Sequence, residues 1–327
     1  MFPFSNLRPF GLDIGSATLK AVELERKNGT ITAPRAAIAS MPGGAFSGGV
    51  LLDPPAAAEA IRKLCREHRF RGKHVITGVS GSDVFVARVK LERGAPETLA
   101  ARIRERACDA APFSLEQAYL DYQLIDNFSD SQWVDVLVAA VKPGRLDVLQ
   151  DVLRRAGKRA TIVDVVSCAL ANVFEVNYAP APSAVSGLLH VGASTLTVCI
   201  VRGSTPLIAE EVSLTTVAGE TAELNRAERV AIELERIFEQ MDEIADEHPL
   251  EPGSGQIERL FLSGGGARSR GLPEVLKERI GLPFEELNPF RKIELSGSDT
   301  LSRLVWDHAH CMPVAVGLAL RGLDERG

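Results

Sequence analysis

An internal repeat constrains the fold of this sequence more than any other feature. Residues 12–19 read Leu-Asp-Ile-Gly-Ser-Ala-Thr-Leu, and residues 189–196 read Leu-His-Val-Gly-Ala-Ser-Thr-Leu. In both copies an apolar strand leads into a turn of small residues, and a second apolar strand follows. A repeat spaced by about half of a 327-residue chain predicts two domains of similar architecture.

The residues around the two copies predict the same order of elements in each half. Alternating apolar positions predict three strands in each half, at 10–15, 19–25 and 31–39 and at 187–191, 195–201 and 206–212. Apolar residues at helical spacing predict helices at 56–67, 97–111, 146–156, 167–176, 220–245, 271–280 and 312–323. Further strands are expected at 74–79, 83–91, 119–125, 133–141, 162–166, 256–262 and 284–287. Alternating strands and helices predict an α/β fold.

Two segments divide this pattern into domains. Residues 83–145 look like a small α/β insertion within the first half, and the Pro-Ala-Pro run within 178–183 is the best candidate for a linker. We therefore expect a first domain of residues 1–82 and 146–180, an inserted subdomain of residues 83–145 and a second domain of residues 183–327.

Charge and cysteine content exclude several classes of protein. Lys and Arg number 37 against 43 Asp and Glu, so the net charge is −6; we expect no nucleic-acid partner, because phosphate neutralisation needs a concentrated basic face. The five cysteines show no CxxC spacing, which favours buried free thiols in a reducing cytoplasm.

Residues 1–10 resemble no signal peptide and no window approaches about 18 apolar residues, so we expect a soluble chain without a membrane span. The basic run 62–73 is interpreted as a solvated helix face, with attraction to an anionic membrane surface as the alternative.

Three loops of small residues follow apolar strands and form the candidate binding site, at 13–18, 192–195 and 264–267. Glycine lets a backbone N–H group approach a ligand because no Cβ atom stands in the way. Successive N–H groups form a concave nest for phosphate oxygens. Two such loops facing each other across a cleft would grip a triphosphate, and the third would contact the nucleoside. The alternative for the third loop is a tight turn from strand to helix.

The sequences of these loops resemble a known superfamily. The three loops are similar to the two phosphate loops and the adenosine loop of the actin-like ATPases, which include sugar kinases and heat-shock chaperones. Within that superfamily, the chain resembles the PilM family of type IV pilus assembly proteins in seven segments. These are residues 11–24, 120–124, 136–142, 163–165, 262–267, 287–290 and 313–322. The resemblance implies a duplicated actin-like fold of two RNase H-like domains, and the inserted subdomain points to the branch that holds PilM and FtsA.

The resemblance also implies which residues would bind ATP and Mg²⁺. Asp13 would hold the metal through water, and the phosphates would lie against the first two loops. Lys20 would add positive charge beside them, and its alternative is a solvent-facing strand position. The expected nucleotide-binding residues are Asp13, Gly15, Ser16, Ala17, Thr18, Lys20, Gly192, Ala193 and Ser194, with Gly264, Gly265 and Gly266 at the adenosine.

Two departures from the family pattern predict that nucleotide binding is weak or lost. His190 stands where an active member has an aspartate, and imidazole is a poor ligand for the hard cation Mg²⁺. A partly protonated His190 in contact with phosphate and a packed neutral His190 are the alternatives. The stretch of about 213–256 looks shortened and lacks most of a nucleotide-side subdomain; Ala227-Glu228 is followed by Ala231 where the family has Lys.

The function implied by the resemblance is that of a cytoplasmic scaffold in the inner-membrane assembly complex of a type IV pilus. Such a scaffold would bind the cytoplasmic tail of a PilN-like membrane protein in a groove beside the inserted subdomain. It would reach PilO- and PilP-like periplasmic proteins through that partner and lie at the periphery of the inner membrane. Two alternatives stay open: an active ATPase or phosphotransferase of the actin-like superfamily, and a type II secretion component similar to GspL. No catalytic residue is predicted for the scaffold.

Overall fold

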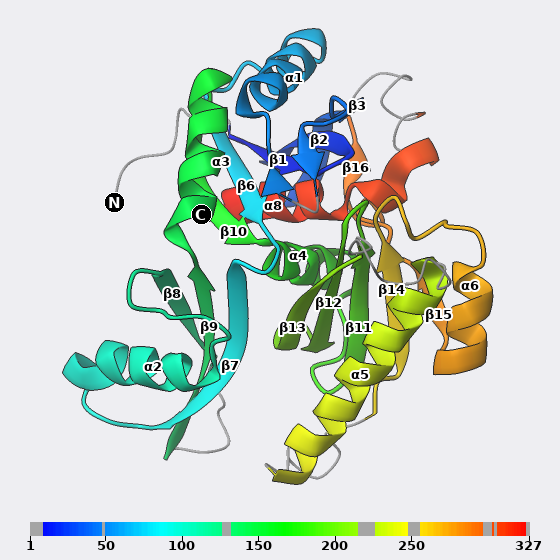
Figure 1. Cartoon of the computed structure of the whole chain (residues 1–327). Coiled ribbons are helices and arrows are strands. Elements are labelled where there is room, and N and C mark those ends of the chain that lie inside the picture. The colour runs from blue at the N-terminus through cyan, green and yellow to red at the C-terminus, as the bar shows by residue number, and fades with distance from the viewer. Residues whose placement is uncertain are drawn as a thin grey trace.

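The computed structural model describes residues 9–47, 50–125, 132–214, 226–247, 256–296, 303 and 306–324 (Figure 1). Its largest sheet has six strands in the order β10–β6–β1–β2–β3–β16. β1 (Phe10–Ile14), β2 (Thr18–Lys27) and β3 (Thr30–Ser40) form an antiparallel meander, and β6 (His74–Val79) and β10 (Arg159–Val165) continue the sheet in parallel. Asn28 and Gly29 both have positive φ at the turn from β2 to β3, as an Asn-Gly hairpin predicts.

The second sheet repeats this arrangement in the order β13–β12–β11–β14–β15. β11 (Val185–Val191), β12 (Thr195–Arg202) and β13 (Thr205–Ser213) form the meander, and β14 (Arg259–Ser263) and β15 (Phe284–Glu286) are the parallel strands. One hydrogen bond is repeated as well: Thr77 Oγ1 donates to Leu12 O at 2.8 Å, and Ser263 Oγ donates to Leu189 O at 3.1 Å. The predicted duplicated α/β fold is confirmed.

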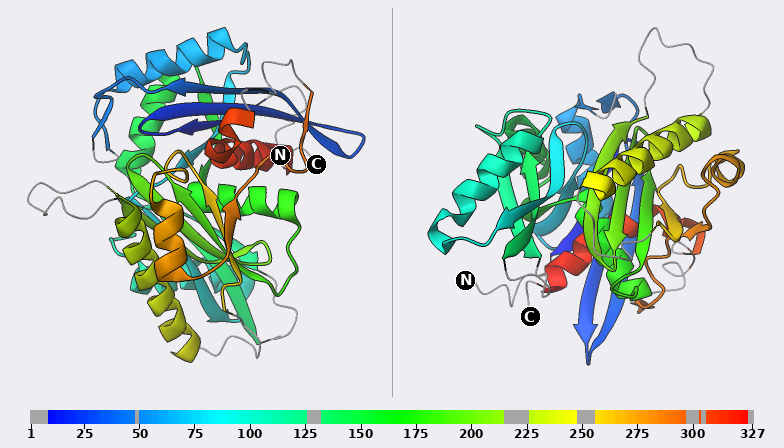
Figure 2. Two further views of the ribbon diagram at one scale, coloured as in Figure 1. Left: turned by 90° about the vertical axis from the view of Figure 1, so that its right-hand side faces the viewer. Right: turned by 90° about the horizontal axis from the view of Figure 1, so that it is seen from below.

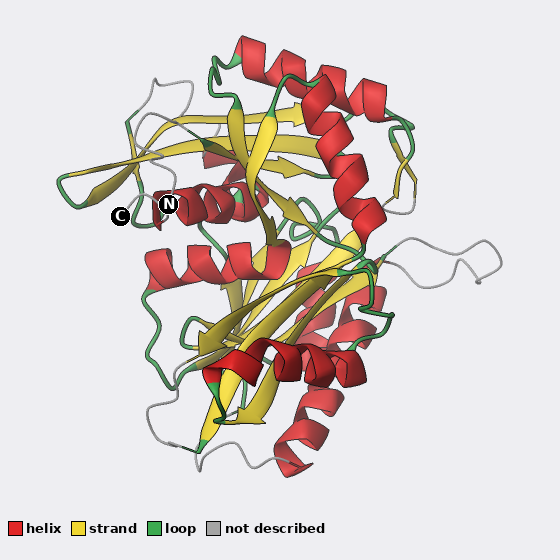
Figure 3. Cartoon of the chain, turned by 90° about the vertical axis from the view of Figure 1, so that its left-hand side faces the viewer, coloured by secondary structure: helices red, strands yellow, loops and turns green. Residues whose placement is uncertain are grey.

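Two helices lie between the two sheets (Figures 2 and 3). α8 (Pro313–Asp324) packs on β1, β2 and β6, whereas α4 (Val166–Tyr178) packs on β12 and β13, and the two helices pack against each other. The contact is close because a Cβ atom on Gly317 would lie 1.9 Å from Ala169 O. The buried side chains of α4, α8 and both sheets form one apolar core.

The outer faces of both sheets are covered by other helices (Figure 1). α1 (Pro54–Glu67) and α3 (Pro143–Arg155) pack together beside the first sheet, and buried residues of both join one apolar cluster with β1, β2 and β6. α5 (Arg226–Glu247), α6 (Leu272–Val275) and the following π-helical turn (Leu276–Ile280) cover the second sheet. Of the helix expected at 220–245, residues 220–225 lie outside the described residues. No helix in the described part of the chain is long and apolar enough to cross a membrane.

A third, smaller sheet has the order β7–β9–β8. It contains β7 (Val84–Glu92), β8 (Tyr119–Ile125) and β9 (Trp133–Val141), and α2 (Pro96–Ala110) covers it with an apolar core of their own. The chain enters and leaves this sheet at one place, because Val84 at the start of β7 pairs with Val141 at the end of β9. Lys142 Nζ lies 2.8 Å from Asp83 Oδ1 at the same place. The expected domain boundaries at 83 and 145 stay a prediction.

The sequence did not predict the positions of four elements: the short strands β4, β5 and β16 and the last helix, α8. β4 (Phe46–Ser47) pairs with β5 (Val50–Leu51), and β16 (Glu294–Leu295) pairs with β3. β16 and α8 therefore lie against the first sheet, although they fall within the segment expected as the second domain. Backbone pairing holds β16 there, and burial of apolar side chains holds α8 there. The periodicity of a sequence predicts a strand or a helix, but it does not indicate which sheet that element joins.

Candidate functional site

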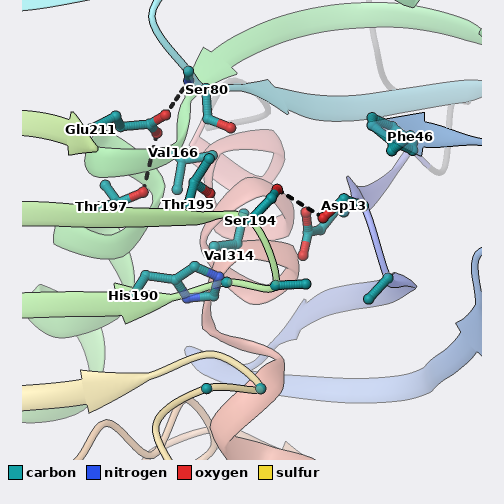
Figure 4. Close-up of a pocket in the computed structure, with 18 of the residues that line it drawn as sticks. Asp13, Phe46, Ser80, Val166, His190, Ser194, Thr195, Thr197, Glu211 and Val314 are labelled. Carbon is teal, nitrogen blue, oxygen red and sulfur yellow. Dashed lines mark hydrogen bonds between the residues drawn. The ribbon is translucent and has the colours of Figure 1, made fainter. Parts of the chain in front are cut away.

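A cavity of about 450 Å³ lies between the two sheets and is lined by residues of both halves (Figure 4). All the predicted nucleotide-binding residues except Gly264 line it, so Asp13 and Gly192 share one cleft, as the repeat predicts. The short β4–β5 hairpin contributes Phe46 and Val50 to its wall. The roles of these residues in binding stay predictions.

The two phosphate-type loops have the same backbone geometry. Gly15 N–H donates to Thr18 O at 3.1 Å, and Gly192 N–H donates to Thr195 O at 2.8 Å. A Cβ atom on Gly15 would lie 2.9 Å from Thr18 O, which explains why the first loop needs glycine there. The sequence repeat therefore encodes a repeated backbone structure.

The loops touch each other across the cavity. Ser16 Oγ lies 2.9 Å from Ser194 Oγ, and the two side chains come from opposite halves of the chain. A phosphate placed between the loops would have to separate this pair. The structure thus shows the loops in a closed arrangement.

Asp13 forms an ion pair with Lys20 within the first sheet. The two residues are directly opposite on β1 and β2, and Lys20 Nζ lies 2.9 Å from Asp13 Oδ2. The side chain of Lys20 is only 9% exposed, so the alternative of a solvent-facing lysine is wrong. A magnesium ion would have to compete with this ammonium for the carboxylate. In the described part of the chain, no group of three or more His, Cys, Asp or Glu side chains is placed to hold a metal ion.

His190 is a packed, neutral histidine. Its pKa is lowered to about 4, mainly by burial and also by the positive charge of Lys20, while Asp13 opposes these effects. His190 Nδ1 lies 3.0 Å from Ser263 Oγ, whose own hydrogen is donated to Leu189 O. Nδ1 must therefore carry the proton and donate to Ser263, which leaves Nε2 as an acceptor. Of the two alternatives for His190, this geometry supports the neutral one, and a neutral imidazole with a bare Nε2 does not attract phosphate.

The third loop is built around the end of β11. A Cβ atom on Gly264 would lie 2.4 Å from Val191 O, and one on Gly266 would lie 2.5 Å from Val191 Cγ1. Gly264 has a φ of +89°, and its N–H donates to His310 O at 2.7 Å. Two of the three glycines are therefore required by a tight turn, and Gly265 is the one whose added Cβ would meet only Cys311 Sγ, at 4.0 Å.

Glu211 on β13 is a cavity residue that the sequence analysis missed (Figure 4). Thr197 Oγ1 donates to its Oε1 at 3.1 Å, and Gly81 N–H donates to its Oε2 across the two halves. Burial raises its pKa to about 7, against the opposing effects of these hydrogen bonds and of Arg145. The sequence did hold a signal for a buried acidic side chain here. Glu210 and Glu211 are adjacent in a strand, so their side chains must point to opposite faces of the sheet.

Arg226 is a second cavity residue that the sequence analysis missed. It lies at the start of the described part of α5, and its guanidinium donates to Gly192 O and to Ala193 O, the latter at 2.8 Å. Its Nε atom is buried and has no hydrogen-bond partner in the described structure. This orphaned donor beside the second loop fits an anion such as phosphate.

Comparison with known proteins matches this chain to one family. The sequence model described as "Type IV pilus assembly protein PilM" matches residues 11–213 and 250–323. The unmatched residues between these ranges fall within the stretch of about 213–256 that the sequence predicts to depart from the family pattern.

Solved structures show the same likeness. One, described as "PilM-PilN type IV pilus biogenesis complex", is 26% identical with a TM-score of 0.75, covering 97% of this chain and 99% of that one. A Bacteroides thetaiotaomicron protein with an actin-like ATPase fold and unknown function is 11% identical with a TM-score of 0.50, covering 97% and 98%. The second likeness is of fold alone, and it supports the actin-like fold expected from the loops. The chain belongs to the PilM family of type IV pilus assembly proteins.

Proposed function

We propose that this chain is a scaffold of a type IV pilus assembly complex and binds the cytoplasmic tail of a PilN-like membrane protein. The observation that carries the proposal is the likeness to the PilM–PilN complex at 26% identity over 97% of this chain. The scaffold would lie in the cytoplasm at the periphery of the inner membrane and reach PilO- and PilP-like proteins through its partner. The family match supports this pilus interpretation over the secretion-system alternative.

The small sheet offers a surface for such a tail. β8 is at the edge of this sheet and, among the described residues, pairs with β9 alone, which leaves its other edge available for a peptide strand. Its side chains Tyr119, Tyr122 and Leu124 are 58%, 38% and 47% exposed. An extended tail that pairs with β8 would cover these apolar side chains.

Peptide capture tests this surface. A labelled peptide with the sequence of the PilN-like tail should bind the full chain, and Tyr122→Ser with Leu124→Ser should weaken binding at least about tenfold, because two apolar contacts of about 1 kcal/mol each are lost. Ile232→Ser is the matched control, since Ile232 is similarly exposed at 37% but lies on α5. Undiminished capture by the β8 variant would rule out this surface, and no capture by the wild type would rule out the tail itself.

We infer that nucleotide binding is weak or lost. The carboxylate of Asp13 already forms an ion pair with Lys20. His190, its counterpart in the second half, is neutral. The contact between Ser16 and Ser194 closes the space between the two loops. The alternative of an active ATPase or phosphotransferase is favoured by one observation, the orphaned Nε of Arg226 at the second loop. Calorimetric titration with ATP, with and without Mg²⁺, separates the two.

A further inference from the structure

A second hollow in the structure is lined by basic side chains. It has a volume of about 420 Å³, and the described residues that line it include six basic ones and no acidic one. The six are Arg62, Arg66, Arg69, Arg71, Lys73 and Lys158. We call this site the basic hollow. Positive charge is thus concentrated at one site, although the chain as a whole has a net charge of −6.

The basic hollow lies at the N-terminal ends of strands β6 and β10 of the first sheet, whereas the cavity between the two sheets lies at their C-terminal ends. Its residues come from the C-terminal part of α1, the turn between α1 and β6, and the turn between α3 and β10. β6 and β10 are parallel and begin at these turns, whereas Ser80 and Val166, just beyond their other ends, line the cavity. β6 has six residues, so its two ends, and with them the two sites, are roughly 20 Å apart. A ligand of the basic hollow would therefore leave the cavity free.

Most of these charges are not neutralised within the described structure. Lys158 Nζ donates to Phe70 O and Gly72 O, at 3.0 and 2.7 Å, and so ties the two turns together. Arg62 pairs with Glu59 at 2.6 Å. The exposed side chains of Arg66, Arg69, Arg71 and Lys73 have no hydrogen bond or ion pair to any described residue. Four cations are thus free to meet an external anion.

We propose that the basic hollow docks the protein onto a membrane surface by binding the phosphates of anionic phospholipids. Guanidinium groups match phosphate oxygens in pairs, and clustered Lys and Arg are attracted to anionic leaflets within a screening length of the surface. The hollow is open, and its free cations are long, exposed side chains, as a headgroup layer requires. This contact is separate from tail binding and would add to it.

Vesicle flotation with the full chain tests the proposal. The protein should float with vesicles in which about a third of the lipid is phosphatidylglycerol and not with pure phosphatidylcholine vesicles. At 1 M salt, where the screening length is about 3 Å, flotation should be lost. Each Lys or Arg near the surface strengthens binding roughly fivefold, so Arg71→Glu with Lys73→Glu should weaken vesicle binding at least about 25-fold.

The matched control changes the same charge elsewhere. Arg270→Glu with Lys277→Glu alters two exposed basic residues of the second half, and this variant should bind anionic vesicles nearly as well as the wild type. Thermal melting checks that both double variants are folded. Equal losses in the two variants, or no binding of the wild type to anionic vesicles, would overturn the proposal. Calorimetric binding of soluble tripolyphosphate without vesicle binding would also overturn it and assign the hollow to a soluble polyanion.

Discussion

At the scale of single residues, the two repeats hold different chemistry at equivalent positions. Asp13 is opposite Lys20 on the neighbouring strand, whereas His190 is opposite Thr197. The first half therefore carries a buried ion pair, and the second carries a neutral imidazole hydrogen-bonded to Ser263. Among the described residues, the acidic side chain that the second half brings to the cavity is Glu211 on β13, two strands away from His190 on β11.

His190→Asp should strengthen Mg²⁺-dependent ATP binding. A carboxylate at 190 would face Asp13 and give a divalent cation a second anionic ligand. We expect about a tenfold gain in affinity that appears only with Mg²⁺, measured by isothermal titration, while His190→Asn, which adds no charge, should show no gain. Micromolar Mg·ATP binding with steady phosphate release by the wild type would contradict the degraded site.

Glu211→Gln should change how stability depends on pH. The folded-state pKa of Glu211 is about 7, above the ordinary value of 4.5, so the folded protein binds the proton more tightly and loses stability as pH rises between these values. The wild type should therefore lose about 2–3 kcal/mol relative to the glutamine variant from pH 4.5 to 7.5. Urea unfolding of both proteins across this range measures the difference. His190 titrates in an overlapping range with the opposite sign, but it is present in both proteins and cancels. An unchanged difference would show that Glu211 is ionised throughout.

At the scale of elements, the α4–α8 contact decides how the two sheets are held together. α8 follows the second sheet in the chain and yet packs on the first, while α4 follows the first sheet and packs on the second. Each helix thus crosses to the other half, and the contact between them lies at the centre of the apolar core.

Gly317→Ala should destabilise the protein, because the added Cβ would lie 1.9 Å from Ala169 O and force the helices apart. The expected loss is about 1–3 kcal/mol in the free energy of unfolding. Gly144→Ala on α3 is the matched control: a Cβ atom there meets nothing within 4 Å, so the change should be neutral or slightly stabilising. Similar urea midpoints for the two variants would show that α8 can shift without cost.

At the scale of the whole molecule, the closed contact between the halves is the state that ATP would have to open. The Ser16→Cys, Ser194→Cys variant should form a disulfide on oxidation, because the two Oγ atoms are 2.9 Å apart. Oxidation should then abolish any ATP binding and leave capture of the PilN-like peptide unchanged, since β8 lies on a separate sheet. The single variant Ser16→Cys controls for the native cysteines. Loss of peptide capture on oxidation would show that the two sites are coupled.

The internal repeat was sufficient to predict the duplicated fold and the cleft. It placed equivalent loops on equivalent strands, and local glycine and strand patterns are sufficient to specify such loops. Contacts in the folded chain were needed to learn that Lys20 is buried against Asp13 and that His190 is neutral. The same holds for the findings that Glu211 and Arg226 line one cavity and that α8 returns to the first sheet. The reason is physical: pairing, burial and pKa depend on which residues meet across strands and halves, whereas sequence patterns report only neighbours along the chain.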